Sequence, residues 1–140
     1  MSSPAELSAS ELPMDSTLTG PVLIIGSGLL GASIGLGLRA AGCDDVYVQD
    51  ISPTAEAVAQ DIGAGTSFST LSEEERTAFA PQLVVVAAPP DSAGAVCARA
   101  LNTYAPRPEA GYPGAVVTDV ASVKVQPLAD VLALSLIHIS

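Results

Sequence analysis

The chain has 140 residues, 49% hydrophobic and 4% aromatic, with a formal charge of −10 from 15 acidic and 5 basic side chains. That length is one domain's worth, enough to bury a hydrophobic core. The sequence has no cluster of basic residues, so nucleic acid and anionic membranes are poor partners. It also has no apolar stretch near the roughly 20 residues of a membrane span, and no signal-peptide pattern at its start.

The two cysteines, Cys43 and Cys97, stand alone, without the close spacing of a metal or redox motif. Cys43 is predicted to lie in the loop after the first helix, and Cys97 on an apolar helix face. We therefore expect reduced thiols, a cytoplasmic location and no metal site.

The first predicted strand, Val22–Ile25, runs directly into a G-x-G-x-x-G motif. The six residues of the motif are Gly26, Ser27, Gly28, Leu29, Leu30 and Gly31. Gly26 allows a sharp turn, Gly28 allows backbone to approach a pyrophosphate, and Gly31 allows the next helix to pack closely on the sheet. The phosphates would lie at the N-terminus of a helix predicted over 29–41, where unpaired N–H groups favour negative charge. The motif therefore predicts dinucleotide binding by these six residues.

The second predicted strand, 46–49, ends at Asp50, about 20 residues after the motif, which is the usual spacing. A carboxylate there accepts hydrogen bonds from both adenosine ribose hydroxyls and repels a 2′-phosphate. No basic residue follows Asp50 before Arg76, so NAD is favoured over NADP. The alternative is a surface Asp that caps the helix beginning at Ser52.

The middle of the chain predicts further alternation of helix and strand. Ser52 and Pro53 are typical of a helix start, and that helix carries apolar residues at Ala55, Val58, Ala59 and Ile62. A short third strand is predicted within 66–71, followed by a capping box at 72–75 that begins a short helix.

The remaining elements complete the predicted fold. The strand 83–87 is apolar on both faces, as in parallel sheets covered by helices. A helix beginning at Asp91 or Ser92 reaches about Tyr104, and a proline-rich loop, 105–114, leads to the strand 115–118. This alternation predicts a Rossmann-type, doubly wound, mainly parallel α/β sheet.

Two further segments leave strands at the carboxyl edge of the predicted sheet. Ala88 and Pro89 form a stiff wall beside the nicotinamide ribose, or only a turn between strand and helix. The segment Thr118-Asp-Val-Ala-Ser-Val-Lys124 offers an acid, a hydroxyl and an amine. Taken alone, Ser122 is most simply a helix cap and Lys124 a surface cation.

With these pieces in order, the chain resembles the prephenate dehydrogenase family, including its arogenate-using relatives. The glycine motif is common to many dehydrogenases, but the D-V-x-S-V-K segment is more specific. The resemblance covers about residues 21–132, the family's nucleotide-binding domain. It implies NAD-dependent oxidative decarboxylation of prephenate to 4-hydroxyphenylpyruvate, towards tyrosine, by a homodimer. It also implies a catalytic role for Ser122, beside the substrate hydroxyl.

The sequence departs from the family after this segment. The family has a catalytic histidine in a His-Pro segment, then arginines in a helical C-terminal domain, whereas the only histidine here, His138, precedes Ile139. Residues 134–140 resemble the translation of a sequencing adaptor, the alternative being an apolar strand before a stop codon. We therefore expect a disordered leader (1–19), a truncated NAD-binding domain (20–133) and an adaptor translation (134–140).

Such a fragment is expected to be inactive alone. Two other functions stay open on the sequence. One is a freestanding NAD(H)-binding regulatory module, and the other is a different NAD-dependent dehydrogenase with a helical second domain.

Overall fold

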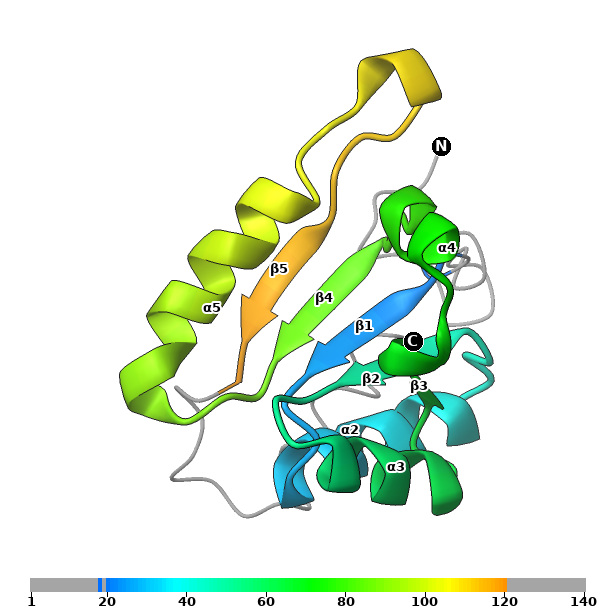
Figure 1. Cartoon of the computed structure of the whole chain (residues 1–140), viewed down its shortest axis with the longest axis vertical. Coiled ribbons are helices and arrows are strands. Elements are labelled where there is room, and N and C mark those ends of the chain that lie inside the picture. Colours follow the sequence, from blue (N-terminus) through cyan, green and yellow to red (C-terminus); the bar gives the residue numbers. More distant parts are fainter. Residues whose placement is uncertain (1–17, 19, 121–140) are drawn as a thin grey trace, which may run out of the picture.

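In the computed structural model, which describes residue 18 and residues 20–120, five parallel strands form one sheet in the order β3-β2-β1-β4-β5 (Figure 1). The elements in chain order are β1 (Val22–Ile25), α2 (Leu29–Ala40), β2 (Val46–Gln49), α3 (Pro53–Asp61), β3 (Thr66–Ser67), η2 (Phe68–Thr70), α4 (Glu73–Ala78), β4 (Leu83–Val86), α5 (Pro90–Thr103), η3 (Pro108–Ala110) and β5 (Val116–Asp119). The predicted Rossmann-type α/β fold is confirmed.

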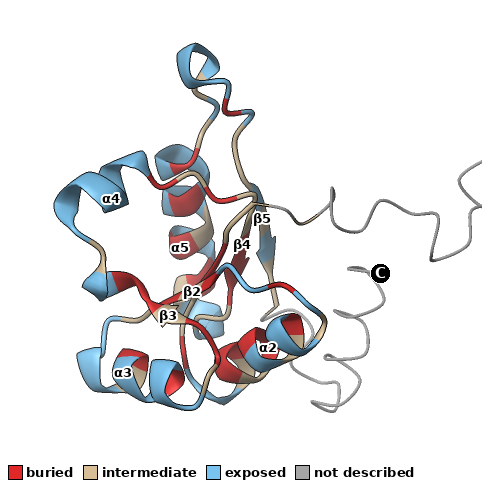
Figure 2. Cartoon of the chain, turned by 90° about the vertical axis from the view of Figure 1, so that its right-hand side faces the viewer, coloured by how far each residue is buried: buried red, intermediate tan, exposed pale blue. Residues whose placement is uncertain are grey.

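The sheet is covered on both faces because every residue of its central strands β1 and β4 is apolar, so successive side chains need cover on opposite faces. Val22 and Ile24 of β1 belong to a core that includes buried residues of α2 and α3. Leu23, between them, belongs to a second core that includes the buried face of α5. Buried residues accordingly follow the strands and the inward sides of these helices, whereas α4 is exposed (Figure 2).

Most predicted elements are observed within a residue or two, and the exceptions have physical reasons. The third strand is limited to Thr66–Ser67, because Phe68 turns into η2 and packs edge-on against Phe79. Helix α5 begins at Pro90 rather than at Asp91 or Ser92, with Pro89 as its N-cap.

Helix α3 buries few of its apolar side chains. Val58 and Ile62, two of the apolar residues noted in the sequence, are each 51% exposed. The side chains that α3 buries are those of Ala59 and Glu56, which are three residues apart and so share one helical face. The buried face of α3 therefore carries a carboxylate beside a small apolar side chain.

The remaining expectations concern cysteines, metals and chain ends. Cys43 lies in the loop after α2 but is buried, and Cys97 is partly buried on α5. Within residues 18 and 20–120, no group of three potential ligands could hold a metal ion, and no helix is long and apolar enough to cross a membrane. The segment 134–140 and all but Leu18 of the leader lie outside the described residues.

Candidate nucleotide-binding site

Gly26 turns the chain sharply between β1 and α2. Its φ of +102° lies in the region that favours glycine, and its N–H donates to the Gln49 carbonyl at an N···O distance of 2.7 Å. A Cβ on Gly26 would lie 2.8 Å from the carbonyl oxygen of Ala87. Glycine is therefore required here by both backbone conformation and space, and the turn lies beside the chain that leaves β4.

Gly31 holds the start of α2 against this turn. A Cβ at Gly31 would lie 1.8 Å from the carbonyl oxygen of Gly26 and 3.4 Å from the Cβ of Ala87. The sequence predicted close packing on the sheet, and the structure places that contact at the turn and at the end of β4. We call residues 26–31 the glycine turn.

The N-terminus of α2 is open to an anion. Gly28 is its N-cap, no side chain caps the helix, and its first turn has no acidic residue. A Cβ on Gly28 would meet no atom within 4 Å. Leu29 is 79% exposed, whereas Leu30 packs against the core on the α2 side of the sheet. Unpaired N–H groups at such a helix end favour a phosphate.

Asp50 lies beside the glycine turn, at the carboxyl end of β2. Its Oδ2 accepts hydrogen bonds from Ser27 N and Ser27 Oγ at 2.7 and 2.9 Å, and its Oδ1 accepts one from Ser52 N at 2.8 Å. Burial acts to raise the pKa of Asp50, but these hydrogen bonds outweigh it and hold the pKa below the ordinary value of 3.8. Asp50 is therefore a carboxylate at neutral pH, in contact with both Ser27 and the start of α3.

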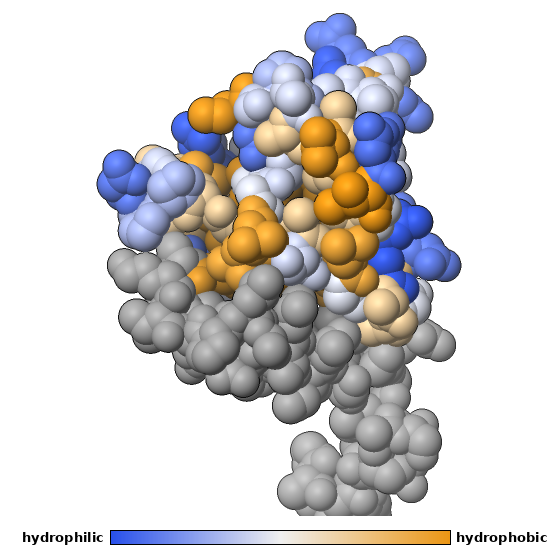
Figure 3. All heavy atoms as spheres, turned by 90° about the horizontal axis from the view of Figure 1, so that it is seen from below, coloured by the Kyte–Doolittle hydropathy of each residue, from blue (hydrophilic) through white to orange (hydrophobic). Residues whose placement is uncertain are grey.

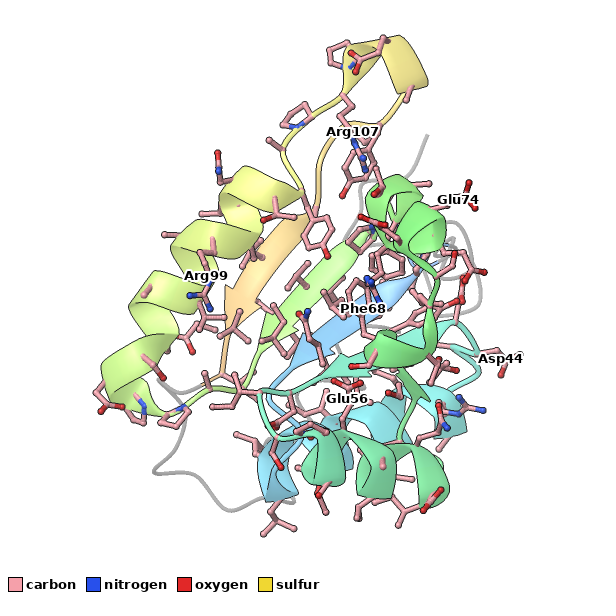
Figure 4. The ribbon with its side chains drawn as sticks, viewed as in Figure 1. Asp44, Glu56, Phe68, Glu74, Arg99 and Arg107 are labelled. Carbon is pink, nitrogen blue, oxygen red and sulfur yellow. The ribbon has the colours of Figure 1, made fainter. Side chains whose placement is uncertain are left out.

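A pocket of about 290 Å³ adjoins Asp50 on the α5 side of the sheet. Its lining residues are Ile25, Gln49, Asp50, Ile51, Val96, Arg99, Ala100, Thr103 and Tyr104. Arg99 projects from α5 (Figure 4), and Ile51 is fully exposed. Figure 3 shows the molecule from the end of the sheet to which the strands point, and exposed apolar side chains lie there among polar ones.

Sequence reasoning missed Arg99. Arg76 is the first basic residue after Asp50 in the sequence, but α5 brings Arg99, 49 positions after Asp50, to the pocket that adjoins Asp50. The available signal was helical spacing, since Val96, Arg99 and Thr103 recur every three or four residues and lie on one face.

The loop after β4 lies next to the glycine turn. The carbonyl of Ala87 faces Gly26, Ala88 packs against the core on the α5 side, and Pro89 is the N-cap of α5. The loop is thus a turn between β4 and α5, as one of the two alternatives predicted. It also borders the glycine turn, so the other alternative, a wall beside the nicotinamide ribose, stays open. Contact of Ala88 and Pro89 with a cofactor stays a prediction.

The last predicted segment is described only in part. Asp119 ends β5 and pairs in register with Val86 of β4, so it lies at the same sheet edge as the glycine turn. Ser122 and Lys124 lie outside the described residues.

Comparison with known proteins supports the predicted resemblance. The sequence is 38% identical over 112 residues to NovF of Streptomyces niveus, described as a probable prephenate dehydrogenase. That match covers 80% of this chain and 26% of NovF, so the chain spans about a quarter of its curated relative. No protein-family model matches the chain.

Solved structures give the same result. The prephenate dehydrogenase of Aquifex aeolicus, in complex with hydroxyphenyl propionate and NAD⁺, matches with a TM-score of 0.57 and 27% identity over 86% of this chain and 38% of that one. A putative prephenate dehydrogenase from Corynebacterium glutamicum matches with a TM-score of 0.54 and 26% identity, over 84% of this chain and 34% of that one. The matches cover the N-terminal portion of these proteins.

Proposed function

Because this chain is similar in sequence and fold to the N-terminal portion of prephenate dehydrogenases, we infer that it is the NAD-binding part of such an enzyme. One observation carries the proposal. The carboxylate of Asp50 and the open N-terminus of α2 lie on either side of Ser27, at one end of a parallel sheet. Nucleotides bind at this end of such sheets.

The described residues fit NAD. The pyrophosphate would lie at Gly28, where no atom fills the space of a Cβ, against the N-terminus of α2. The adenosine ribose would lie at Asp50, and the adenine in the adjoining pocket between Ile51 and Arg99. An exposed aliphatic side chain and a planar guanidinium suit the faces of an adenine ring.

Asp50 also explains a preference for NAD over NADP. A carboxylate has about four acceptor sites, and donors of Ser27, Ser52 and Ile51 already act on this one. A ribose hydroxyl would therefore replace the rotatable Ser27 Oγ–H. The negative charge of Asp50 repels a 2′-phosphate. Arg99 is the basic residue that lines the adjoining pocket, and its single positive charge would attract that phosphate.

The proposed reaction is oxidative decarboxylation of prephenate or arogenate, towards tyrosine. Bound NAD supplies the acceptor for a hydride. The residues of this chain bind the cofactor, orient it and exclude water, and Ser122 is proposed to lie beside the substrate hydroxyl. A homodimer and a cytoplasmic location belong to the same proposal. Because these residues correspond to only about a quarter to two fifths of the relatives' length, we expect the 140 residues alone to show no turnover.

Titration calorimetry of the chain with NAD⁺ and NADP⁺ tests the cofactor proposal. We expect NAD⁺ to bind and NADP⁺ to bind at least about tenfold more weakly, since one lost or repulsive contact to a charge costs about 1.5 kcal/mol or more. Asp50→Asn should narrow that difference, and Glu109→Gln, on exposed η3, is the matched control. Equal affinity for the two cofactors, or no binding of either, would refute the proposal. A measurable NAD⁺-dependent rate with prephenate would refute the expected inactivity.

A further inference from the structure

Glu56 is a charged residue at a position that the fold would ordinarily fill with an apolar side chain. It lies on α3 and is 1% exposed, the one charged residue among the buried residues of the described chain. Figure 4 shows it between α3 and the sheet. Burial of an unpaired carboxylate costs several kcal/mol, so its presence calls for specific hydrogen bonds.

Those hydrogen bonds join Glu56 to the residue that follows β2 and to the segment formed by β3 and η2. Oε2 accepts from the backbone N–H of Asp50 at 2.9 Å. Oε1 accepts from the backbone N–H of Ser69 at 2.9 Å and from the hydroxyl of Ser67. Burial acts to raise the pKa of Glu56, but the bonds from Ser67, Ser69 and Asp50 hold it below the ordinary value. Glu56 is therefore a buried carboxylate that is stabilised by hydrogen bonds from N–H and O–H donors.

Asp50 is therefore fixed through its side chain and through its backbone. Its carboxylate is bonded to Ser27 and Ser52, and its backbone N–H is bonded to Glu56. The N–H of Asp50 lies just past the last residue of β2, where the sheet no longer sets the direction of the chain. The Glu56 bond sets that direction instead, six residues away and on the buried side of α3.

We propose that Glu56 is a positioning residue for cofactor binding, which fixes the backbone of Asp50 so that its carboxylate faces the glycine turn and the adenosine ribose. The inference rests on the proposed function and deepens it, because it assigns a buried residue to the recognition of the ribose. Glu56 acts through Asp50 and does not touch the cofactor itself.

A double-mutant cycle tests the inference in the full 140-residue chain, with the NAD⁺ dissociation constant as the readout. Glu56→Gln places an N–H₂ group against one of the N–H donors, and we expect roughly tenfold weaker NAD⁺ binding, the effect of losing one bond to a charged group. In an Asp50→Asn background the same change should weaken binding less than about twofold, because the carboxylate that it orients is already gone.

Ser67→Ala is the matched control. It removes a hydroxyl from Oε1 and leaves the bond between Oε2 and Asp50, so NAD⁺ affinity should stay within about twofold of wild type while the chain loses some stability. An equal loss of NAD⁺ affinity on Glu56→Gln in both backgrounds would show that Glu56 acts through the scaffold in general, and would overturn the inference.

A measurement on the wild-type chain covers the case in which Glu56→Gln does not fold. The Asp50 amide proton should exchange slowly with solvent and should shift as Glu56 is protonated at acid pH. Exchange as fast as that of an open amide would overturn the inference. Absence of NAD⁺ binding by the wild-type chain would refute the proposed function and this inference together, whereas NAD⁺ binding unchanged by Glu56→Gln would refute this inference alone.

Discussion

Ser27 donates two hydrogen bonds to a single oxygen of Asp50, from its backbone nitrogen at 2.7 Å and from its hydroxyl at 2.9 Å. The two residues are 23 positions apart and follow the neighbouring strands β1 and β2. Because the bonds join the glycine turn to the end of β2, the two parts of the candidate nucleotide site form one unit.

Ser27→Ala should raise the pKa of Asp50 and lower the free energy of unfolding by about 1 kcal/mol, since it removes one hydrogen bond to a carboxylate and leaves the backbone bond. The pKa is measured by carbon NMR titration of the Asp50 carboxyl group. Ser52→Ala is the control, because it removes the helix cap to Ala55 and costs about 1 kcal/mol while the Ser52 N–H to Asp50 remains. A Ser52→Ala variant with the larger shift in the Asp50 pKa would contradict the prediction.

Gly31→Ala should destabilise the chain by about 3 kcal/mol or more, because the added methyl group would overlap the carbonyl of Gly26, which cannot move without opening the turn. Gly94→Ala, within α5, is the matched control. A Cβ at Gly94 meets no atom within 4 Å, so that change should stabilise the chain by about 0.5–1 kcal/mol through helix propensity. Urea unfolding of both variants measures these changes in the free energy of unfolding. Similar effects at the two positions would contradict the close contact between Gly31 and the Gly26 carbonyl.

Acid should destabilise the chain through Asp50 and Glu56. Both pKa values lie below their ordinary values of 3.8 and 4.5 in the folded chain, because hydrogen bonds outweigh burial. A depressed folded pKa gives stability that is present above the ordinary value and is lost as the pH falls through the folded one. The free energy of unfolding should therefore decline below about pH 4.5. Asp50→Asn should make that decline shallower, and an unchanged pH dependence would show that Asp50 contributes nothing to it.

Tyr112→Phe should cost about 1–3 kcal/mol, because the buried hydroxyl donates to the Pro81 carbonyl at 2.6 Å and its loss leaves that carbonyl unpaired. This bond attaches the loop before β5 to the segment before β4. Tyr47→Phe is the control: Tyr47 is only partly buried, and its partner Asp45 regains water. Thermal unfolding that ranks Tyr47→Phe as the more damaging change would contradict the prediction.

The order of elements and the position of the candidate site were predictable from short-range patterns. Uninterrupted apolar runs predicted β1 and β4, and Ser52 and Ser72 marked the starts of α3 and α4 through local caps. The spacing between the glycine motif and Asp50 predicted that the two would meet. Such signals depend on residues a few positions apart, or on a strand–helix–strand unit whose geometry varies little.

The tertiary structure decided which side chains complete the site. Arg99 reaches the pocket because α5 crosses the opposite face of the sheet from α3, which no local pattern around Asp50 contains. Burial of Glu56 is possible because three donors, from the residue after β2, from β3 and from η2, converge on it, while the apolar Val58 and Ile62 remain half exposed. Periodicity counts apolar residues along one helix, whereas the environment of a buried carboxylate is set by segments that meet only when the sheet has formed.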